Sequence, residues 1–249
     1  MDRFEAEVYE PSRQRRQALL DQFGDGQLDE AELPKDVLTT LLRNQDSLEL
    51  PPDVMKREIC FYLQAGAHST ANAFTHTVDD LLAWGSRHPE DLDRARSSIS
   101  FVQRGMHESL RLNPASPMAY RSPLADVTLS DGTFLPTGVL VVLDLEAANR
   151  DESLFGTDAG EYNPHREVAD GIPRWGMSFG AGTHACIGAE LDGGLEIDPD
   201  RADGEQLFGT VAVMAHAFLR AGGRQDPDDP PELDPGSTRT HYGRYPVVF

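Results

Sequence analysis

The residues with the clearest capacity for chemistry lie in one short stretch, 178–190, which reads Ser-Phe-Gly-Ala-Gly-Thr-His-Ala-Cys-Ile-Gly-Ala-Glu. Its glycines allow tight backbone turns and close approach to a flat ligand. The pattern predicts that Cys186 begins a helix, where the dipole and free amides would stabilise a thiolate. A thiolate is a soft, electron-rich ligand that suits iron. His184, two residues earlier, is expected to offer a hydrogen-bonding or cationic edge to a carboxylate.

A single cysteine also has other common explanations. Most often it is a small buried hydrophobe, and Cys60 fits that interpretation. A zinc site would need four nitrogen, sulfur or oxygen ligands, and no second cysteine lies near Cys186. A nucleophilic cysteine paired with His184 would need an orienting group, and none is evident nearby. The cysteine by itself leaves these alternatives open.

Composition narrows the class of protein. The chain has 249 residues with 22 basic and 42 acidic side chains, so its formal net charge is −20. Such a charge repels phosphates and argues against a nucleic-acid partner. Two cysteines cannot build a disulfide framework, and the longest apolar run, Val139–Leu143, is too short to span a bilayer. We therefore expect an acidic globular protein of the cytoplasm, with no membrane partner.

Hydrophobic periodicity predicts a mainly α fold with a minor β-sheet, arranged as a single domain over residues 1–249. Period-two segments at 126–129 and 139–143 suggest a hairpin, and 244–249 suggests a terminal strand. The expected helices are 12–23, 34–44, about 52–84, about 97–112, one starting near Cys186, and about 205–221.

The pattern Phe-Gly-x-Gly-x-His-x-Cys-x-Gly at 179–188 resembles the haem-binding loop of cytochromes P450. The resemblance implies a cytochrome P450 fold and a haem b cofactor (iron protoporphyrin IX) whose axial ligand is the thiolate of Cys186. It also implies cofactor-binding roles for other loop residues, namely Phe179, Gly180, Gly182, His184 and Gly188.

Three further segments resemble family motifs in the same order along the chain. Glu108-Ser-Leu-Arg111 resembles the Glu-x-x-Arg motif, whose two charged residues share one helix face. Residues 162–166, Tyr-Asn-Pro-His-Arg, resemble the segment that supplies a second arginine, here Arg166. The implied role of these three charged residues is structural. Arg121 stands where the family places a basic group against a haem propionate, a role that a guanidinium fork suits.

Residues 65–70, Ala-Gly-Ala-His-Ser-Thr, resemble the family's Ala-Gly-x-Asp/Glu-Thr-Thr groove on the oxygen-binding side of the haem. The resemblance implies that Gly66 makes room there and that His68, Ser69 and Thr70 are catalytic, delivering protons. His68 replaces the acidic residue of the motif, and Ser69 replaces the first threonine. As an alternative, the two hydroxyl side chains simply bond the preceding helical turn.

The resemblance extends over about 33–249 and corresponds to the C-terminal portion of a family member. It implies a truncated haem-thiolate monooxygenase that inserts one oxygen atom of dioxygen into a small organic substrate. The implied partners are a ferredoxin and ferredoxin reductase-type electron donor and a separate chain that supplies the N-terminal half. We expect an insertion at 193–203, and substrate-pocket walls at Pro117–Tyr120 and around Tyr242.

Two alternatives to this function remain open. One is a non-catalytic remnant or subunit with weak or no haem binding. The other is a peroxide-driven haem enzyme.

Overall fold

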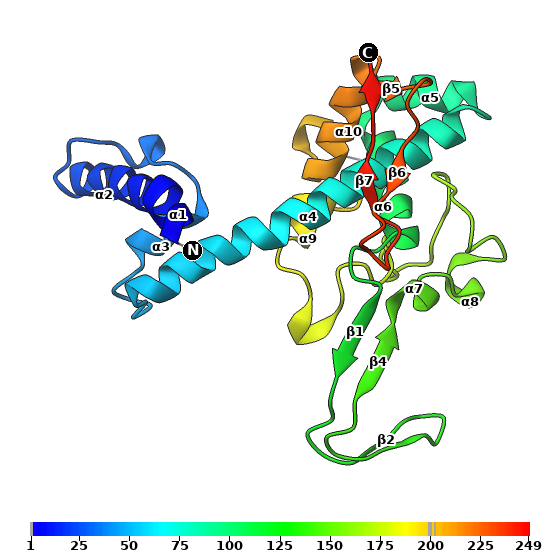
Figure 1. The fold of residues 1–249 in the computed structure, drawn as a ribbon, viewed down its shortest axis with the longest axis horizontal. Coiled ribbons are helices and arrows are strands. Elements are labelled where there is room, and N and C mark those ends of the chain that lie inside the picture. Colours follow the sequence, from blue (N-terminus) through cyan, green and yellow to red (C-terminus); the bar gives the residue numbers. More distant parts are fainter. Residues whose placement is uncertain (1, 199–200, 202) are drawn as a thin grey trace. The chain divides into compact units, whose positions relative to one another are not determined.

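The computed structural model describes residues 2–198, 201 and 203–249 of the chain. Two compact units are present, Met1–His68 and Ser69–Phe249, and each has its own hydrophobic core. Helix α4, Pro52–Gly85, contributes residues to both units (Figure 1). The assignment of residues 1–249 to a single partial domain stays a prediction.

The first unit is helical throughout its regular structure. Its core groups Tyr9, Leu38, Leu42 and Met55. Its elements before α4 are α1 (Asp2–Phe4), the π-helix η1 (Glu5–Tyr9), α2 (Glu10–Gly24), the 3-10 helix η2 (Glu30–Glu32) and α3 (Val37–Arg43).

The second unit is built around α6 (Ile99–Leu112), which the side chain of Ser98 caps by accepting from Phe101 N. Most of α6 is buried, so it carries polar as well as apolar side chains into the interior. Its apolar residues share a core with α4 and α10. The remaining helices of this unit are α5 (Pro89–Ser97), α7 (Leu145–Ala148), α8 (Glu152–Phe155), η3 (Gly182–His184), α9 (Ala189–Gly193), η4 (Asp203–Glu205) and α10 (Thr210–Arg220).

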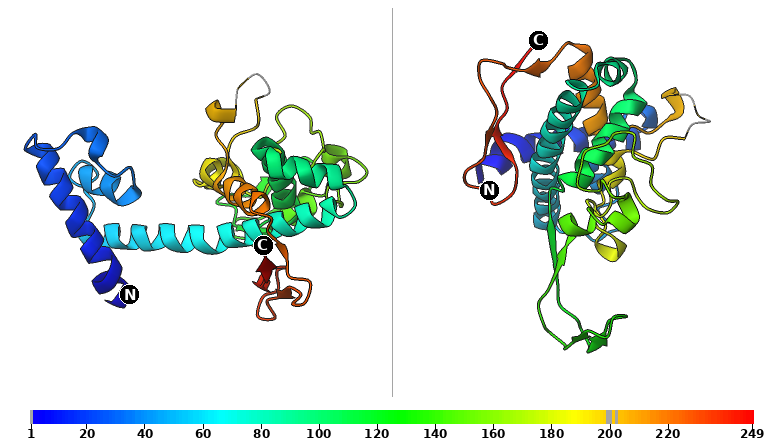
Figure 2. Two further views of the ribbon diagram at one scale, coloured as in Figure 1. Left: turned by 90° about the horizontal axis from the view of Figure 1, so that it is seen from above. Right: turned by 90° about the vertical axis from the view of Figure 1, so that its right-hand side faces the viewer.

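Four antiparallel two-stranded ladders complete the described part of the second unit. Their pairs are β1 (Met118–Arg121) with β4 (Val141–Asp144), β2 (Val127–Thr128) with β3 (Phe134–Leu135), β5 (Arg224–Gln225) with β8 (Val247–Val248), and β6 (Glu232–Leu233) with β7 (Tyr242–Arg244). In Figures 1 and 2 the β1–β4 ladder and the β2–β3 hairpin project away from the helices of this unit.

The expected pairing of 126–129 with 139–143 is wrong. The strand β4 pairs with β1 instead, and Arg121 lies opposite Val141. The segment after Leu129 turns back at once, because Gly132 takes a positive φ of 89° and lets β3 follow within a few residues. Alternation of apolar residues predicts strands but does not identify their partners.

Helices α9 and α10 are separated along the chain by residues 194–209. Near the two ends of this segment, Gly194 and Phe208 form an isolated antiparallel bridge. Thr210, the first residue of α10, donates from Oγ1 to the carbonyl of Leu191 in α9 at 2.9 Å. This bond and the bridge join the ends of α9 and α10. Residues 199, 200 and 202 of the insertion that the sequence predicts at 193–203 lie outside the described residues, so the insertion stays a prediction.

Among the helices that the structure describes, none combines the length and the apolar character needed to cross a membrane.

Candidate functional site

The cysteine loop is fixed by its own backbone. The N–H of Cys186 donates to the carbonyl of Phe179 at 2.8 Å, and Gly180 N donates to Met177 O at 2.8 Å. Gly180 and Gly182 take φ values of +69° and +66°, a region that other residues rarely adopt. Glycine is therefore required for this loop path, and the pattern in the sequence reflects backbone geometry.

Cys186 itself is exposed. Ile187, the next residue, and Leu191, in α9, are 77% and 71% exposed, so the chain after the cysteine presents apolar side chains to solvent. A Cβ at Gly188 would lie 3.8 Å from the cysteine Sγ. The placement of Cys186 at a helix start is wrong, because α9 begins three residues later, at Ala189. A dipole of that five-residue helix therefore does not explain a thiolate here.

The two predicted propionate partners are exposed side chains of the second unit. His184 lies in η3, two residues before the cysteine. Arg121 lies at the end of β1, where its Nη1 donates to the carbonyl of Tyr120 at 2.9 Å. Both side chains are open to a carboxylate from outside the chain.

Glu108, Arg111 and Arg166 meet in the interior of the second unit. Arg111 donates from Nε and Nη2 to the two carboxylate oxygens of Glu108, at 2.8 and 2.7 Å. Arg166 Nε and the backbone N–H of Asn163 donate to Oε1 of the same carboxylate, at 2.9 and 3.1 Å. Burial alone would lower the pKa of Arg166, but hydrogen bonds to Asp158 and Glu108 raise it. The structure thus brings the three predicted network residues together.

This network continues to the start of the cysteine loop through Asn149, which is fully buried. Asn149 donates from Nδ2 to the carbonyl of Arg111 at 2.9 Å and to Ser178 Oγ at 3.0 Å. Its Oδ1 accepts from Met177 N at 2.6 Å. Ser178 Oγ in turn donates to the carbonyl of Leu110 at 2.6 Å. The end of α6 therefore holds the loop at its entrance.

A second set of contacts holds the chain after the loop. His107 Nε2 lies 2.6 Å from the carbonyl of Gly193, and burial lowers the pKa of this histidine to about 4. The neutral ring therefore donates through Nε2 and packs edge-to-face on Trp175, 4.8 Å between centroids. One turn earlier on α6, Gln103 Nε2 donates to Leu195 O at 2.5 Å. The loop is thus anchored on both sides by a single helix.

Sequence reasoning missed these supporting residues. Gln103 and His107 lie four residues apart on a helix, so they share a face. Two polar residues on the interior face of a helix could have indicated that they bond a buried segment of the chain. Asn149 offered no signal, because its partner Arg111 is 38 positions away. Only the fold shows that contact.

The predicted groove residues fall on both sides of the boundary between the units. Gly66 and His68 belong to the first unit, where both are exposed. Ser69 and Thr70 belong to the second unit, and Thr70 Oγ1 donates to Asp192 Oδ2 at 2.7 Å. The hydroxyl of Thr70 therefore bonds α9, the helix after the cysteine loop, rather than the preceding turn of its own helix.

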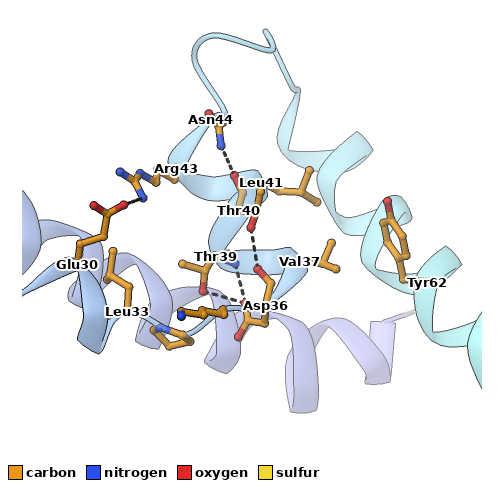
Figure 3. Close-up of a pocket in the computed structure, with 12 residues that line it drawn as sticks. Glu30, Leu33, Asp36, Val37, Thr39, Thr40, Leu41, Arg43, Asn44 and Tyr62 are labelled. Atoms are coloured by element: carbon orange, nitrogen blue, oxygen red, sulfur yellow. Dashed lines mark hydrogen bonds and ion pairs between the residues drawn. The ribbon is translucent and has the colours of Figure 1, made fainter. Parts of the chain in front are cut away.

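A cavity of about 820 Å³ in the first unit is a competing location for a site. Figure 3 shows its wall, where Arg43 pairs with Glu30 at 2.6 Å and the carboxylate of Asp36 caps Thr39 N at 2.8 Å. Among the described residues, those that line it include neither cysteine nor histidine. We therefore place the candidate site at the cysteine loop.

The residues around Cys186 fit a haem. An exposed thiol can deprotonate and bind iron, and the exposed side chains of Ile187 and Leu191 offer the apolar contact that a porphyrin face needs. The imidazole of His184 and the guanidinium of Arg121 are groups that can bind propionates. Thiolate ligation of haem iron is the feature that defines the haem-thiolate class of proteins.

Comparison with known proteins gives the family. Residues 83–191 match the family model described as Cytochrome P450, and this range includes Glu108, Arg111, Arg166 and Cys186. The chain belongs to the cytochrome P450 family, which confirms the resemblance seen in the sequence.

Relatives and solved structures agree with this assignment. A putative cytochrome P450 133B2 of Xylella fastidiosa strain Temecula1 is 32% identical over 157 residues, covering 63% of this chain and 37% of the relative. A self-sufficient cytochrome P450 monooxygenase, CYP505E4 of Penicillium freii, is 28% identical over 187 residues, covering 66% and 17%. The crystal structure of CalO2 matches with a TM-score of 0.68 at 22% identity, covering 100% of this chain and 55% of that chain.

The chain spans a little over a third of the length of the first of these relatives and about half of the solved structure. The solved structure supports the fold alone, and it agrees with the mainly α class with small sheets that periodicity predicts.

Proposed function

We propose that this chain supplies the thiolate-bearing part of a haem monooxygenase that inserts one oxygen atom of dioxygen into a small organic substrate. The observation that carries this proposal is the exposed thiol of Cys186, held on a glycine loop that α6 anchors before and after the cysteine. A thiol kept only for packing would be buried. A thiol that binds a cofactor must be exposed and rigidly placed.

Each candidate residue has one role in this proposal. The thiolate of Cys186 binds iron, and the side chains of His184 and Arg121 bind the two propionates. Gly180 and Gly182 let the backbone approach the macrocycle closely. When bound, the haem supplies the iron at which dioxygen is activated, and thiolate donation favours O–O cleavage.

Protons are proposed to move through His68 and Ser69. An imidazole exchanges protons near neutral pH, and a hydroxyl can both donate and accept. The hydroxyl of Thr70 already donates to Asp192, so we assign Thr70 to positioning rather than to proton delivery.

Completion of the enzyme needs partners. Electrons would come from a ferredoxin and ferredoxin reductase-type donor, and the rest of the fold from residues outside this sequence or from a separate chain. The exposed apolar residues of the projecting ladders, including Met118, Tyr120 and Val142, offer a surface for such a partner. The cytoplasmic location stays a prediction of the sequence.

The test is a carbon monoxide difference spectrum of the dithionite-reduced protein after expression with haem supplementation. We expect the red-shifted Soret band of a thiolate-ligated haem in the unchanged chain and in the control Cys60→Ser, but not in Cys186→Ser. A band that persists in Cys186→Ser would exclude this cysteine as the ligand. A colourless protein in all three cases would favour the non-catalytic alternative, and turnover with hydrogen peroxide alone would favour the peroxide-driven one.

A further inference from the structure

His165 directly precedes Arg166 in the chain but contacts a different helix. Its Nε2 lies 2.7 Å from Oδ2 of Asp91, in the first turn of α5. The same oxygen accepts a hydrogen bond from Nε1 of Trp84, near the end of α4, at 2.8 Å. One carboxylate oxygen therefore joins three segments of the second unit.

The carboxylate of Asp91 is buried, and among the described residues no arginine or lysine forms an ion pair with it. Burial would raise the pKa of this carboxyl, but the hydrogen bonds from Trp84 and His165 lower it. An ionised carboxylate can only accept hydrogen bonds. His165 therefore donates through Nε2–H, whether its ring is neutral or charged.

Residues 163–166 form a tight turn that supplies two donors to Glu108. Arg166 N donates to Asn163 O at 3.0 Å, which closes a β-turn with asparagine at its first position and proline at its second, as such turns favour. The backbone N–H of Asn163 and Nε of Arg166 both donate to Oε1 of Glu108, at 3.1 and 2.9 Å. The orientation of the turn therefore decides whether both donors reach the carboxylate.

His165, the third residue of this turn, gives the turn a second point of attachment. Arg166 joins the turn to Glu108 on α6, and His165 joins it to Asp91 on α5. A turn held at two separate points cannot rotate about either one. Arg166 is buried, and a buried charge that loses its hydrogen bonds is costly, so a fixed orientation matters here.

We propose that His165 is a positioning residue, whose hydrogen bond to Asp91 orients the turn 163–166 so that Arg166 and the backbone N–H of Asn163 reach Glu108. The proposal deepens the proposed function and rests on it only in that the charge network around Glu108 holds the cysteine loop for a cofactor. The alternative is that the bond between His165 and Asp91 serves only to fasten the start of α5.

The experiment follows two side-chain N–H groups by heteronuclear NMR of the full chain without added haem. His165→Phe keeps an aromatic ring and removes the donor. We expect Nε–H of Arg166 to exchange with water about tenfold faster, the ratio that one hydrogen bond to a charged group gives. Nε1–H of Trp84 should keep its chemical shift, because Asp91 stays in place. His165→Gln, which restores a donor, should recover most of the protection. The control His88→Phe removes the ring stacked on Trp84 at 4.1 Å and should leave Arg166 unchanged.

Unchanged exchange at Arg166 in His165→Phe would overturn the proposal. A simultaneous shift of the Trp84 signal would overturn it as well, because α5 rather than the turn would then have moved. Should His165→Phe not fold, His165→Asn replaces it, since its amide is one methylene shorter than that of glutamine. The carbon monoxide spectrum is a separate measurement. A thiolate band with unchanged exchange at Arg166 refutes this inference alone, and the expected exchange without the band refutes the proposed function alone.

Discussion

The acidic side chain of Glu108 on α6 and those of Asp79 and Asp80 on α4 are stabilised in opposite ways. Glu108 is paired with two guanidinium groups, those of Arg111 and Arg166, and its side chain is 4% exposed. Asp79 and Asp80 on α4 are adjacent carboxylates, and among the described residues no arginine, lysine or histidine forms an ion pair with either. The carboxylate of Glu108 is stabilised by opposite charge, and those of Asp79 and Asp80 are stabilised by neutral hydrogen-bond donors.

The neutral donors to Asp80 come from α6. Ser109 Oγ donates to Asp80 Oδ2 at 2.6 Å, and Asn113 Nδ2 donates to the same oxygen at 3.2 Å. The pKa of Asp80 is raised to about 7, mainly by burial and also by the charges of Asp79 and Glu108, against the hydrogen bond from Ser109, which lowers it. This carboxyl is therefore protonated in a large part of the molecules at neutral pH.

Asp79 has a different set of neutral donors, from the C-terminal segment. The hydroxyls of Tyr242 and Tyr245 donate to its two oxygens at 2.8 and 2.9 Å. Burial raises the pKa of both tyrosines, and the nearby carboxylate raises it further, so both stay protonated as donors. The comparison shows that charge pairing makes a cluster vulnerable to loss of one member, whereas neutral donors leave it sensitive to pH.

The largest effect is expected where a buried charge loses its partner. Glu108→Ala leaves the guanidinium group of Arg111 buried without a counter-ion and leaves Arg166 with Asp158 alone, which should lower the free energy of unfolding by about 3–5 kcal/mol. The matched control is Glu167→Ala. Glu167 pairs with Arg104 and Arg174 but its side chain is 75% exposed, so we expect about 1 kcal/mol or less. Urea unfolding followed by circular dichroism measures both, and equal losses would contradict the comparison.

The raised pKa of Asp80 predicts that the stability of the fold falls as pH rises. The pKa of Asp80 is about 7 in the folded state and near 3.9 when unfolded, so the folded state binds more protons between these values. Its contribution to stability is present below the unfolded pKa and is lost as pH rises towards about 7. Since one pKa unit corresponds to about 1.4 kcal/mol, the full loss is at most about 4 kcal/mol.

Asp80→Asn tests this sign, because the amide oxygen still accepts from Ser109 but carries no charge. We expect the variant to gain stability relative to the unchanged chain as pH rises from about 5.5 to 8, a range above the isoelectric point near 4.6. Urea unfolding at several pH values measures the difference, and Asp93→Asn, at an exposed pair with Arg96, should show no such trend. If the difference in stability between the variant and the unchanged chain did not depend on pH, the raised pKa of Asp80 in the folded state would be refuted.

The sequence predicts the charge-paired cluster far better than the neutral one. Glu108 and Arg111 lie on one helix face by spacing alone, and the resemblance to a known family adds Arg166. Asp79 and Asp80 look like ordinary surface carboxylates in the sequence. Their tyrosine and serine partners lie tens of residues away or more, so no local pattern identifies them.

The fold, too, is predicted well where it depends on neighbouring residues and poorly where it depends on residues distant in the sequence. The bounds of α4 follow from local periodicity and capping, since the structure has it at Pro52–Gly85 where the sequence predicts about 52–84. The pairing of β1 with β4 and the anchoring of the loop through Asn149 depend on residues that are distant in the sequence. Periodicity carries no information on such contacts, and only packing decides them.

The smallest effect is expected at the hydrogen bond between Thr70 and Asp192. Here, as at Asp80, the donor is neutral, but the carboxylate is only partly buried. Thr70→Val keeps the β-branched shape and removes the donor, and the loss should be about 1 kcal/mol, since water can reach the carboxylate. Thr75→Val on the same helix is the control. Its hydroxyl donates to the Ala71 carbonyl of the same helix, so the change should stay within about 0.5 kcal/mol.

Hydrogen exchange separates a local role of Thr70 from a global one. If the bond fastens α9 to α4, amides of residues 189–193 should lose protection in Thr70→Val while those of α6 keep theirs. Because α9 follows directly on the cysteine loop, the same change should broaden the signals of Cys186 in an NMR spectrum of the labelled thiol. Unchanged protection in α9 would mean that the anchors from α6, through His107 and Gln103, position the loop without any contribution from α4.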